Sequence, residues 1–201
     1  MRRAFPKVST RLVIAALVLW ASAATAGELD ELDTPYPAPA LELPDTRDAR
    51  RSLEDHRGNV VLVNFWASWC PPCLVEIPSM ARLAQQLGNK GLVVLAVNVG
   101  ESEFKAARAL DMLGFTQPSL LDGSGHAAKA WGVTIYPTSF LVDSEGRIRF
   151  RALGPLEWDD PEVIEAVEAL IAESSPPASL EQAASGMVAF PVNERRTAAN
   201  R

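Results

Sequence analysis

The sequence contains few cysteines and histidines, and each shortage excludes a class of protein. Its 201 residues include two cysteines and two histidines. Two cysteines are too few for a small domain built on several disulfides, and they exclude a structural zinc site made of four cysteines. Basic residues are also in the minority, because 19 Lys and Arg stand against 25 Asp and Glu, for a net charge of −6. Such a chain lacks the basic face that non-specific nucleic-acid binding needs, so we expect no nucleic-acid partner.

The N-terminal region lacks an apolar run long enough to span a membrane comfortably. Its uninterrupted apolar core is the nine residues Leu12–Trp20, against about 20 in a membrane helix. Four basic residues precede this core, and small residues ending in Ala24-Thr25-Ala26 follow it, as in a signal peptide. We therefore interpret residues 1–26 as a signal peptide, cleaved before Gly27, that sends the protein to the periplasm or otherwise out of the cytoplasm.

Two questions about the export segment stay open. An uncleaved segment would instead anchor the protein in the membrane, with its basic end inside. The adjacent Arg2 and Arg3 are compatible with twin-arginine export as well as with ordinary Sec export. Cleavage would remove four positive charges and no negative ones, which takes the net charge from −6 to −10.

The rest of the chain has the composition of one globular domain with extensions, at 48% apolar and 22% charged residues. We expect an acidic, proline-rich linker at 27–40, because prolines and acids crowd this stretch. The domain should occupy residues 41–173. Residues 174–201 have paired prolines and no long periodicity, so we expect a mostly disordered tail.

Hydrophobic patterns in the domain alternate between strands and helices. Continuous apolar runs with β-branched residues predict buried strands at 59–67 and 91–99. Apolar residues at helical spacing predict a helix over 70–87. We expect further helices at 102–113, 125–131 and 159–172, and further strands at 116–121, 138–143 and 147–153. This order predicts an α/β fold, a mixed central β-sheet with helices on both faces.

The two cysteines form the motif Trp69-Cys70-Pro71-Pro72-Cys73, between the first buried strand and the helix that follows. At a helix N-terminus, unpaired N–H groups and the helix dipole stabilise a thiolate, which is the reactive form of cysteine. Prolines are tolerated in the first helical turn. One turn of helix brings Cys73 beside Cys70 and leaves it deeper in the protein. We predict that Cys70 attacks and Cys73 resolves.

Other interpretations of the pair are weaker. A structural disulfide would close a very short loop and gain little from doing so. Zinc would need two more ligands, and only His56 and His126 are available. Haem attachment needs a histidine after the second cysteine, where Leu74 stands. Copper(I) delivery by two thiolates stays open.

The segment Val60–Pro78 resembles the active-site segment of thioredoxin-fold proteins, and more narrowly of exported TlpA/ResA/DsbE-type thiol–disulfide oxidoreductases. The likeness continues through Val94–Gly100, Trp131–Val133 and Ile135–Asp143, and it covers roughly residues 41–173. It implies a thioredoxin-like fold. It also implies that Pro137 is the cis-proline opposite the dithiol, although an ordinary trans turn is the alternative. On this resemblance, we expect a substrate peptide to contact five residues: Trp69, Pro71, Pro72, Tyr136 and Pro137.

Glu76 is a further candidate catalytic residue. Cytoplasmic thioredoxin carries a buried aspartate where this chain has Asn64, and Glu76 is its expected replacement. It lies three residues after Cys73, on the same helical face. Burial would raise the pKa of Glu76 and let it exchange a proton with Cys73. The alternative is a solvated acid near the helix start.

The remaining candidates have simpler expected roles. We expect Trp66 in the core and Trp131 in packing, although Trp66 is also open to lining the peptide-facing surface. We expect Trp158 at the start of the last helix without a chemical role. His56 and His126 lie in polar stretches, and we expect both to be exposed.

Together these features predict a periplasmic protein-disulfide reductase with no organic cofactor. The resemblance implies targets such as apocytochrome c or a copper-site oxidase subunit, and a membrane thiol donor that restores the dithiol. A disulfide oxidase or isomerase is one alternative, because the motif does not fix the redox potential. A Cu(I)-binding metallochaperone is another.

Overall fold

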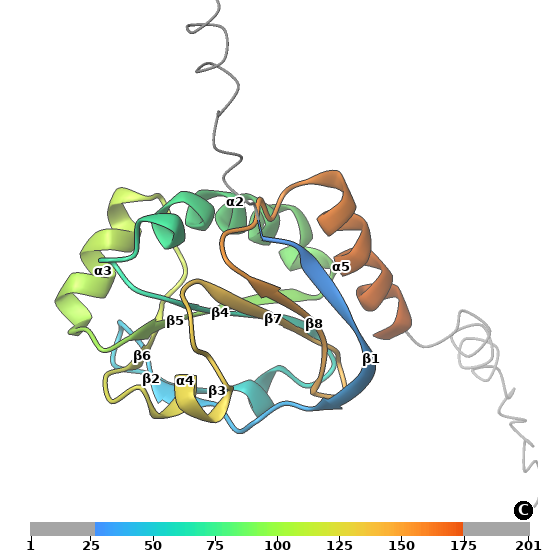
Figure 1. Cartoon of the computed structure of the whole chain (residues 1–201), viewed down its shortest axis with the longest axis horizontal. Helices are drawn as coiled ribbons and strands as arrows, with labels where there is room; N and C mark the ends of the chain where they lie inside the picture. The colour runs from blue at the N-terminus through green and yellow to red at the C-terminus, as the bar shows by residue number, and fades with distance from the viewer. Residues whose placement is uncertain (1–26, 175–201) are drawn as a thin grey trace, which may run out of the picture.

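A six-stranded β-sheet forms the centre of the molecule in the computed structural model, which describes residues 27–174 (Figure 1). The expected signal peptide and residues 175–201 lie outside this range. The strands are β1 (Leu29–Pro37), β2 (Glu42–Pro44), β3 (Arg50–Ser52), β4 (Val60–Trp66), β5 (Leu92–Val99), β6 (Leu120–Asp122), β7 (Thr138–Val142) and β8 (Arg147–Leu153). The helices are η1 (Leu53–His56), α2 (Pro71–Leu87), η2 (Gly88–Lys90), α3 (Glu103–Met112), α4 (His126–Ala130) and α5 (Pro161–Ser174).

The sheet is mixed, with strand order β1-β8-β7-β4-β5-β6. Strands β4, β5 and β6 run parallel, while β7 is antiparallel to both β4 and β8. All seven residues of β4 are buried, as expected for a continuous apolar run at the centre of a covered sheet. The long β4 and β5 pair from Val60↔Leu92 to Trp66↔Asn98, so both predicted central strands are confirmed.

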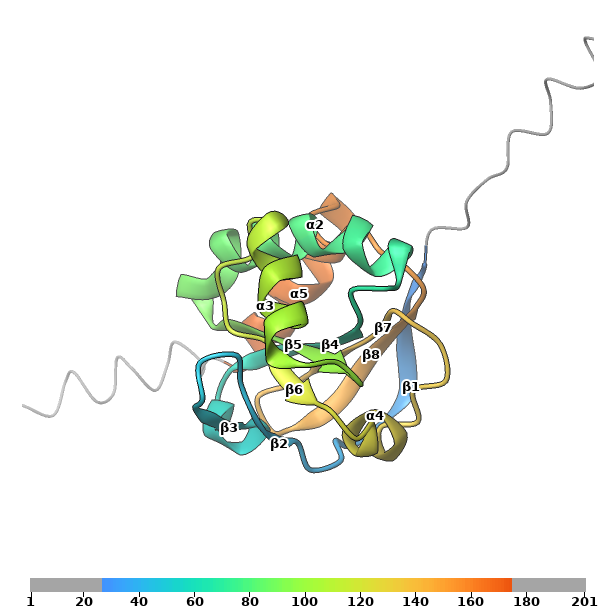
Figure 2. The same cartoon turned by 90° about the vertical axis from the view of Figure 1, so that its left-hand side faces the viewer.

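Helices cover both faces of the sheet, which confirms the predicted α/β fold (Figure 2). Helices α2, α3 and α5 pack on one face, and their buried residues share one apolar cluster. Helix α4 and the small β2–β3 hairpin lie on the other face, over a second cluster that includes Trp131. No helix within residues 27–174 is long and apolar enough to cross a membrane.

The expected linker at 27–40 is wrong as a description of this stretch, because most of it is strand β1. This strand pairs antiparallel with β8 and forms one edge of the sheet. Its pairing is interrupted between Glu31 and Tyr36. Seven of its nine residues are exposed, so it lacks the apolar alternation by which a strand is detected. Prolines are compatible with an edge strand, because a backbone N–H on its unpaired side has no neighbouring strand to bond to.

Two smaller expectations also differ from the structure. Helix α5 continues to Ser174, so the start of the expected tail at 174 is helical. The strand expected at 116–121 begins only at Leu120. Residues 116–119, which precede this strand, follow an irregular path, and the Ser119 carbonyl accepts the Thr46 N–H at 2.9 Å.

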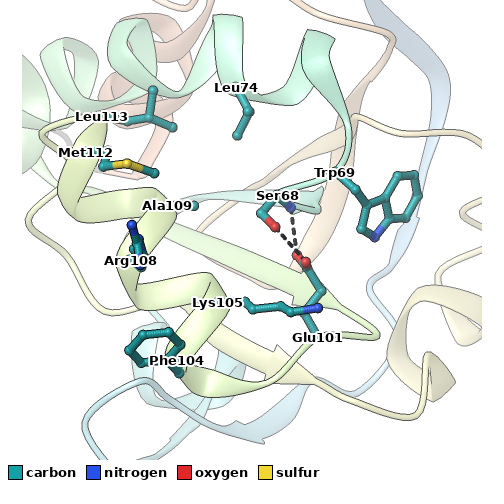
Figure 3. A pocket seen from close by; sticks show the side chains of 10 residues that line it. All are labelled: Ser68, Trp69, Leu74, Glu101, Phe104, Lys105, Arg108, Ala109, Met112 and Leu113. Atoms are coloured by element: carbon teal, nitrogen blue, oxygen red, sulfur yellow. Dashed lines mark hydrogen bonds between the residues drawn. The ribbon is translucent and has the colours of Figure 1, made fainter.

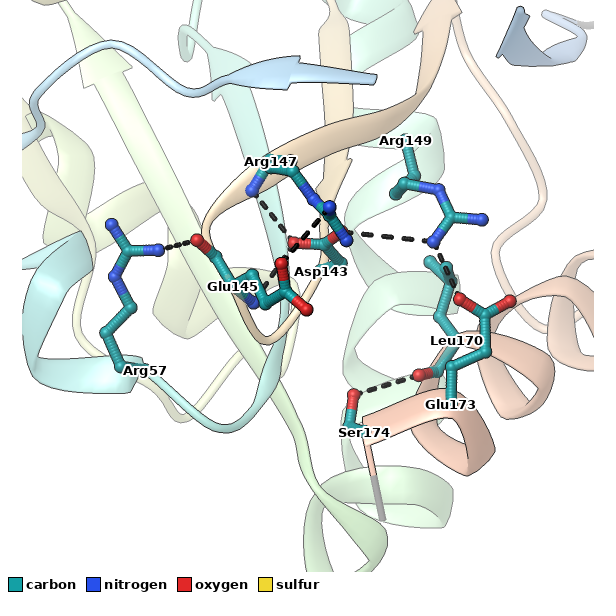
Figure 4. A network of polar contacts seen from close by, with 8 residues as sticks. All are labelled: Arg57, Asp143, Glu145, Arg147, Arg149, Leu170, Glu173 and Ser174. Carbon is teal, nitrogen blue, oxygen red and sulfur yellow. Dashed lines mark hydrogen bonds and ion pairs between the residues drawn. The ribbon is translucent and has the colours of Figure 1, made fainter. Parts of the chain in front are cut away.

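A polar network fixes the β7–β8 hairpin at the end of the sheet away from the cysteines (Figure 4). Asp143 Oδ1 accepts the backbone N–H groups of Glu145 and Arg147 at 3.1 and 2.9 Å. Arg149 pairs with Glu173 at 2.7 Å and so links β8 to α5. Thr138, at the opposite end of β7, pairs with Phe65 of β4, so the segment that leads into β7 enters the sheet at the end nearer the cysteines.

Candidate active site

Cys70 and Cys73 lie at the N-terminus of α2, just after the end of β4. Cys70 is the N-cap residue, and its Sγ accepts the Cys73 backbone N–H at 3.3 Å. Pro71 and Pro72 fill the first two helical positions, where an N–H has no intrahelical acceptor. The two Cα atoms are 5.4 Å apart, and the sulfurs are joined in a disulfide. Cys70 keeps 4% of its surface exposed and Cys73 none, so Cys70 is the more accessible of the two residues.

Trp69 and Tyr136 bring the segment before β7 against the cysteine loop, residues 67–70 between β4 and α2. Their rings form a T-shaped pair with centroids 5.7 Å apart. The Tyr136–Pro137 peptide bond is cis, in agreement with the sequence-based prediction. Trp69 is 63% exposed, whereas Trp66 is fully buried and belongs to the core. The structure therefore places Tyr136, which precedes the cis Pro137, against Trp69, the residue before Cys70.

Glu76 is buried, with 1% of its surface exposed, so the alternative of a solvated helix-start acid is wrong. Its Oε1 accepts a hydrogen bond from Asn64 Nδ2 at 2.6 Å. Its Oε2 accepts the Leu156 N–H at 3.1 Å and the Trp158 Nε1–H at 3.3 Å. Burial raises the pKa of Glu76 to about 7, and the three hydrogen bonds act in the opposite direction.

The position of Glu76 suits proton exchange with the buried cysteine. It follows Cys73 by three residues on α2, which places the two side chains on one face of the helix. A carboxyl with a pKa of about 7 exchanges protons readily at neutral pH. Cys73 has no exposed surface, so solvent has no direct access to its sulfur.

The histidines play no part in this arrangement. His126 is exposed, as expected, but His56 is only half-exposed. Burial lowers the pKa of His56. Within residues 27–174, no three side chains of His, Cys, Asp or Glu come together as a metal site.

A family model described as Redoxin matches residues 34–170. The chain belongs to the redoxin family. It is 35% identical over 123 residues to the thiol-disulfide oxidoreductase ResA of Geobacillus thermodenitrificans, covering 61% of this chain and 71% of that protein. It is 33% identical over 159 residues to the thiol:disulfide interchange protein DsbE of Allochromatium vinosum, covering 78% of this chain and 86% of that protein.

A solved structure agrees with these relatives. The crystal structure of a putative DsbE from Chlorobium tepidum superposes with a TM-score of 0.61 and 32% identity, covering 71% of this chain and 98% of that one. With the Cys70–Cys73 pair, these similarities confirm a thioredoxin-like thiol–disulfide oxidoreductase. The predicted TlpA/ResA/DsbE resemblance is confirmed as well.

Trp158 is a residue of this redoxin site that the sequence did not reveal. Its side chain is fully buried. Its indole N–H donates to Glu76, and its backbone N–H donates to Ser79 Oγ at 2.9 Å. Both acceptors lie on α2, so Trp158 joins the segment before α5 to the active-site helix. An aromatic residue among acids gave no sequence signal for this role.

Glu101 is the second residue that the sequence did not reveal (Figure 3). Its carboxylate accepts the Ser68 N–H and Oγ–H, each at 2.6 Å, and Asn98 Nδ2–H at 2.9 Å. Partial burial raises the pKa of Glu101, but these hydrogen bonds lower it further, so the net pKa is below its ordinary value. The redoxin thus holds the loop before Cys70 with an ionised carboxylate that follows β5.

Proposed function

We propose that the protein reduces disulfides of exported proteins, with Cys70 as the attacking thiol and Cys73 as the resolving thiol. One observation carries this assignment. Cys70 caps α2 and keeps 4% of its surface exposed, whereas its partner Cys73 keeps none. A thiolate at a helix N-terminus is stabilised by the unpaired N–H groups there. A substrate disulfide can approach Cys70, whereas Cys73 can attack only the sulfur that it already contacts.

The reaction balances as two exchanges. The Cys70 thiolate attacks one sulfur of the substrate disulfide, and the other substrate sulfur leaves as a thiolate that takes up a proton. Cys73 then loses its proton and attacks Cys70 Sγ, which releases the second substrate sulfur as a thiolate that takes up a proton from water. The substrate gains two electrons and two protons. The protein ends with the Cys70–Cys73 disulfide, the form seen in this structure.

We assign Glu76 the proton that leaves Cys73. The carboxyl lies one helical turn from Cys73, and its pKa of about 7 lets it accept a proton near neutral pH. When the dithiol is regenerated, Glu76 returns the proton to Cys73. Its role is therefore that of a general base in one half of the cycle and a general acid in the other.

We assign substrate contact to the surface around Cys70. Trp69 is largely exposed and Pro71 is exposed, while Pro72 is half-exposed. Tyr136 lies against Trp69 and leads into Pro137. A peptide laid across this surface would meet the Cys70 sulfur between two aromatic side chains and the backbone of the proline segment.

The compartment and partners follow from the sequence and from the relatives. Residues 1–26 favour export, and we favour a cleaved signal peptide over a retained membrane anchor. We propose that the protein works in the periplasm, where target thiols tend to oxidise. Apocytochrome c and copper-site cysteines of an oxidase subunit are the target classes that we favour, and a membrane thiol donor would restore the dithiol.

Trapping with Cys73→Ser tests this function directly. Without the resolving thiol, the mixed disulfide between Cys70 and the substrate should accumulate, and mass spectrometry should identify the target. Cys70→Ser is the matched control and should trap nothing. A redox potential of about −120 mV, typical of a strong oxidant, would contradict the reductase assignment.

A further inference from the structure

A groove of about 480 Å³ opens beside the cysteine loop, between that loop and α3 (Figure 3). Ser68 and Trp69 line it on the side of the loop, and Leu74 lines it from the first turns of α2. The groove therefore begins at the residue next to Cys70. A peptide bound in it would lie beside the residue that precedes Cys70.

Helix α3 presents an unusual stripe of residues to this groove. Phe104 and Met112 line it with 72% and 73% of their surfaces exposed. Arg108 lies midway between them in the sequence, and a spacing of four residues places all three along one side of the helix (Figure 3). Large apolar side chains are rarely left this exposed in a cluster unless the surface binds something.

The charge of the groove is positive, although the chain as a whole carries −6. Lys105 and Arg108 both line the groove. The only acid in the lining is Glu101, and its oxygens already accept hydrogen bonds from Ser68 and Asn98. Lys105 extends toward Glu101 in Figure 3 and contributes to lowering its pKa. Arg108 forms no ion pair with any residue of 27–174, so its charge is open to a bound acid.

The dimensions of the groove suit a short stretch of extended chain. Helix α3 has ten residues, which corresponds to ~15 Å of length. Four or five residues of extended peptide cover about that distance. The apolar ends and the central arginine of the stripe would then meet alternate positions of such a peptide.

We propose that this groove binds the segment of the substrate protein next to its disulfide, and that the segment carries an acidic residue between large apolar ones. The proposal rests on the proposed reductase function and adds a sequence preference to it. The apolar flanks would cover Phe104 and Met112, and the acid would pair with Arg108. Trp69 would border both the bound segment and the reacting disulfide.

Three synthetic disulfide peptides test the preference. All carry the same pair of cysteines, followed by leucine–serine–glutamate–serine–leucine, leucine–serine–lysine–serine–leucine or serine–serine–glutamine–serine–serine, so that the three tested side chains lie at alternate positions. The reduced full-length protein is mixed with each peptide, and the rate constant of reduction is measured at low peptide concentration. Hydroxyethyl disulfide, which is small and uncharged, reports on the dithiol without the groove.

We expect the glutamate peptide to react about tenfold faster than the serine–glutamine peptide. Arg108→Glu should reverse the order of the glutamate and lysine peptides. Phe104→Ser and Met112→Ser should each slow the glutamate peptide several-fold. Val75→Ser is the matched control, because Val75 is 70% exposed on α2 and does not line the groove. None of these variants should change the rate with hydroxyethyl disulfide.

The outcomes separate the two proposals. Equal rates for the three peptides, with normal reduction of hydroxyethyl disulfide, would overturn the groove assignment alone. Failure to reduce hydroxyethyl disulfide would contradict the proposed reductase function and remove the basis of the groove assignment with it. A dimer that dissociates in the Arg108→Glu variant, measured by light scattering, would assign the groove to a second copy of the chain.

Discussion

The indole N–H of Trp158 donates a hydrogen bond to Oε2 of Glu76 at 3.3 Å, and both side chains are buried. Trp158 stands immediately before the acids that lead into α5, whereas Glu76 lies in the active-site helix. The contact therefore ties the C-terminal part of the domain to the carboxyl that we assign to proton exchange with Cys73. Because the indole stabilises the ionised carboxylate, it limits how far burial raises the pKa of Glu76.

Trp158→Phe should move the pH dependence of disulfide reduction. Removing the indole N–H takes away a hydrogen bond to the carboxylate, so the pKa of Glu76 should rise above about 7. The acidic limb of the rate profile should shift upward by up to about one pH unit. Stopped-flow reduction of a peptide disulfide from pH 5 to pH 9 would measure this.

Two further variants test whether the shift of the acidic limb comes from the titration of Glu76. Trp131→Phe changes a buried tryptophan that packs against Phe65 and Phe140 instead, and its profile should stay like that of the wild type. Glu76→Gln removes the titrating group, so reduction should be slower and the limb should disappear while the fold is kept. A wild-type rate at every pH in Glu76→Gln would leave the carboxyl without a role in proton transfer.

Glu76 should also make the stability of the oxidised protein depend on pH. Its pKa is about 7 in the folded protein, against an ordinary 4.5, so the folded state binds the proton more tightly. The stabilising contribution is complete below pH 4.5 and is lost as the pH rises through 7. Relative to Glu76→Gln, the wild type should lose about 3 kcal/mol of unfolding free energy over this range.

Urea unfolding at several pH values would measure that difference. Glu165→Gln serves as the control, because Glu165 is an exposed acid on α5, and it should keep the wild-type slope. Parallel curves for wild type and Glu76→Gln would contradict a buried carboxyl with a raised pKa.

The sequence predicted the central part of the fold because the signal there is local. Strands β4 and β5 are continuous apolar runs, and α2 carries its own apolar stripe and prolines at its start. Strand β1 escaped prediction because its stability comes from pairing with β8, more than a hundred residues away. An edge strand that is mostly exposed and contains prolines has the composition of a linker.

The same distinction applies to the site. Cys70, Cys73 and Glu76 follow one another along α2, so helical spacing alone relates them. Trp158 is 82 residues from Glu76, and Glu101 is 33 residues from Ser68. The packing of the layers decides which distant side chain contacts a buried polar group. Local periodicity in the sequence does not predict such long-range contacts.

Once the disulfide has been reduced, an alkylating reagent should react with Cys70 before it reacts with Cys73. Cys70 retains some exposed surface at the helix N-terminus, whereas Cys73 is fully enclosed. Iodoacetamide at neutral pH should label Cys70 about tenfold faster or more, because accessibility and thiolate character both favour it. Peptide mass spectrometry after brief labelling would give the two rates. Faster labelling of Cys73 would exchange the roles of the two thiols.

Glu101→Leu should destabilise the oxidised protein by about 1–3 kcal/mol, because the Ser68 N–H and hydroxyl would lose their acceptor beside the cysteine loop. Glu101→Gln keeps an amide oxygen as acceptor and should recover part of the loss. Glu103→Leu is the control, since Glu103 is exposed in the first turn of α3 and removing it should cost less than about 1 kcal/mol. Urea unfolding of the oxidised forms would compare the three variants. Equal losses in Glu101→Leu and Glu103→Leu would mean that Glu101 acts only as a surface charge and does not hold the cysteine loop.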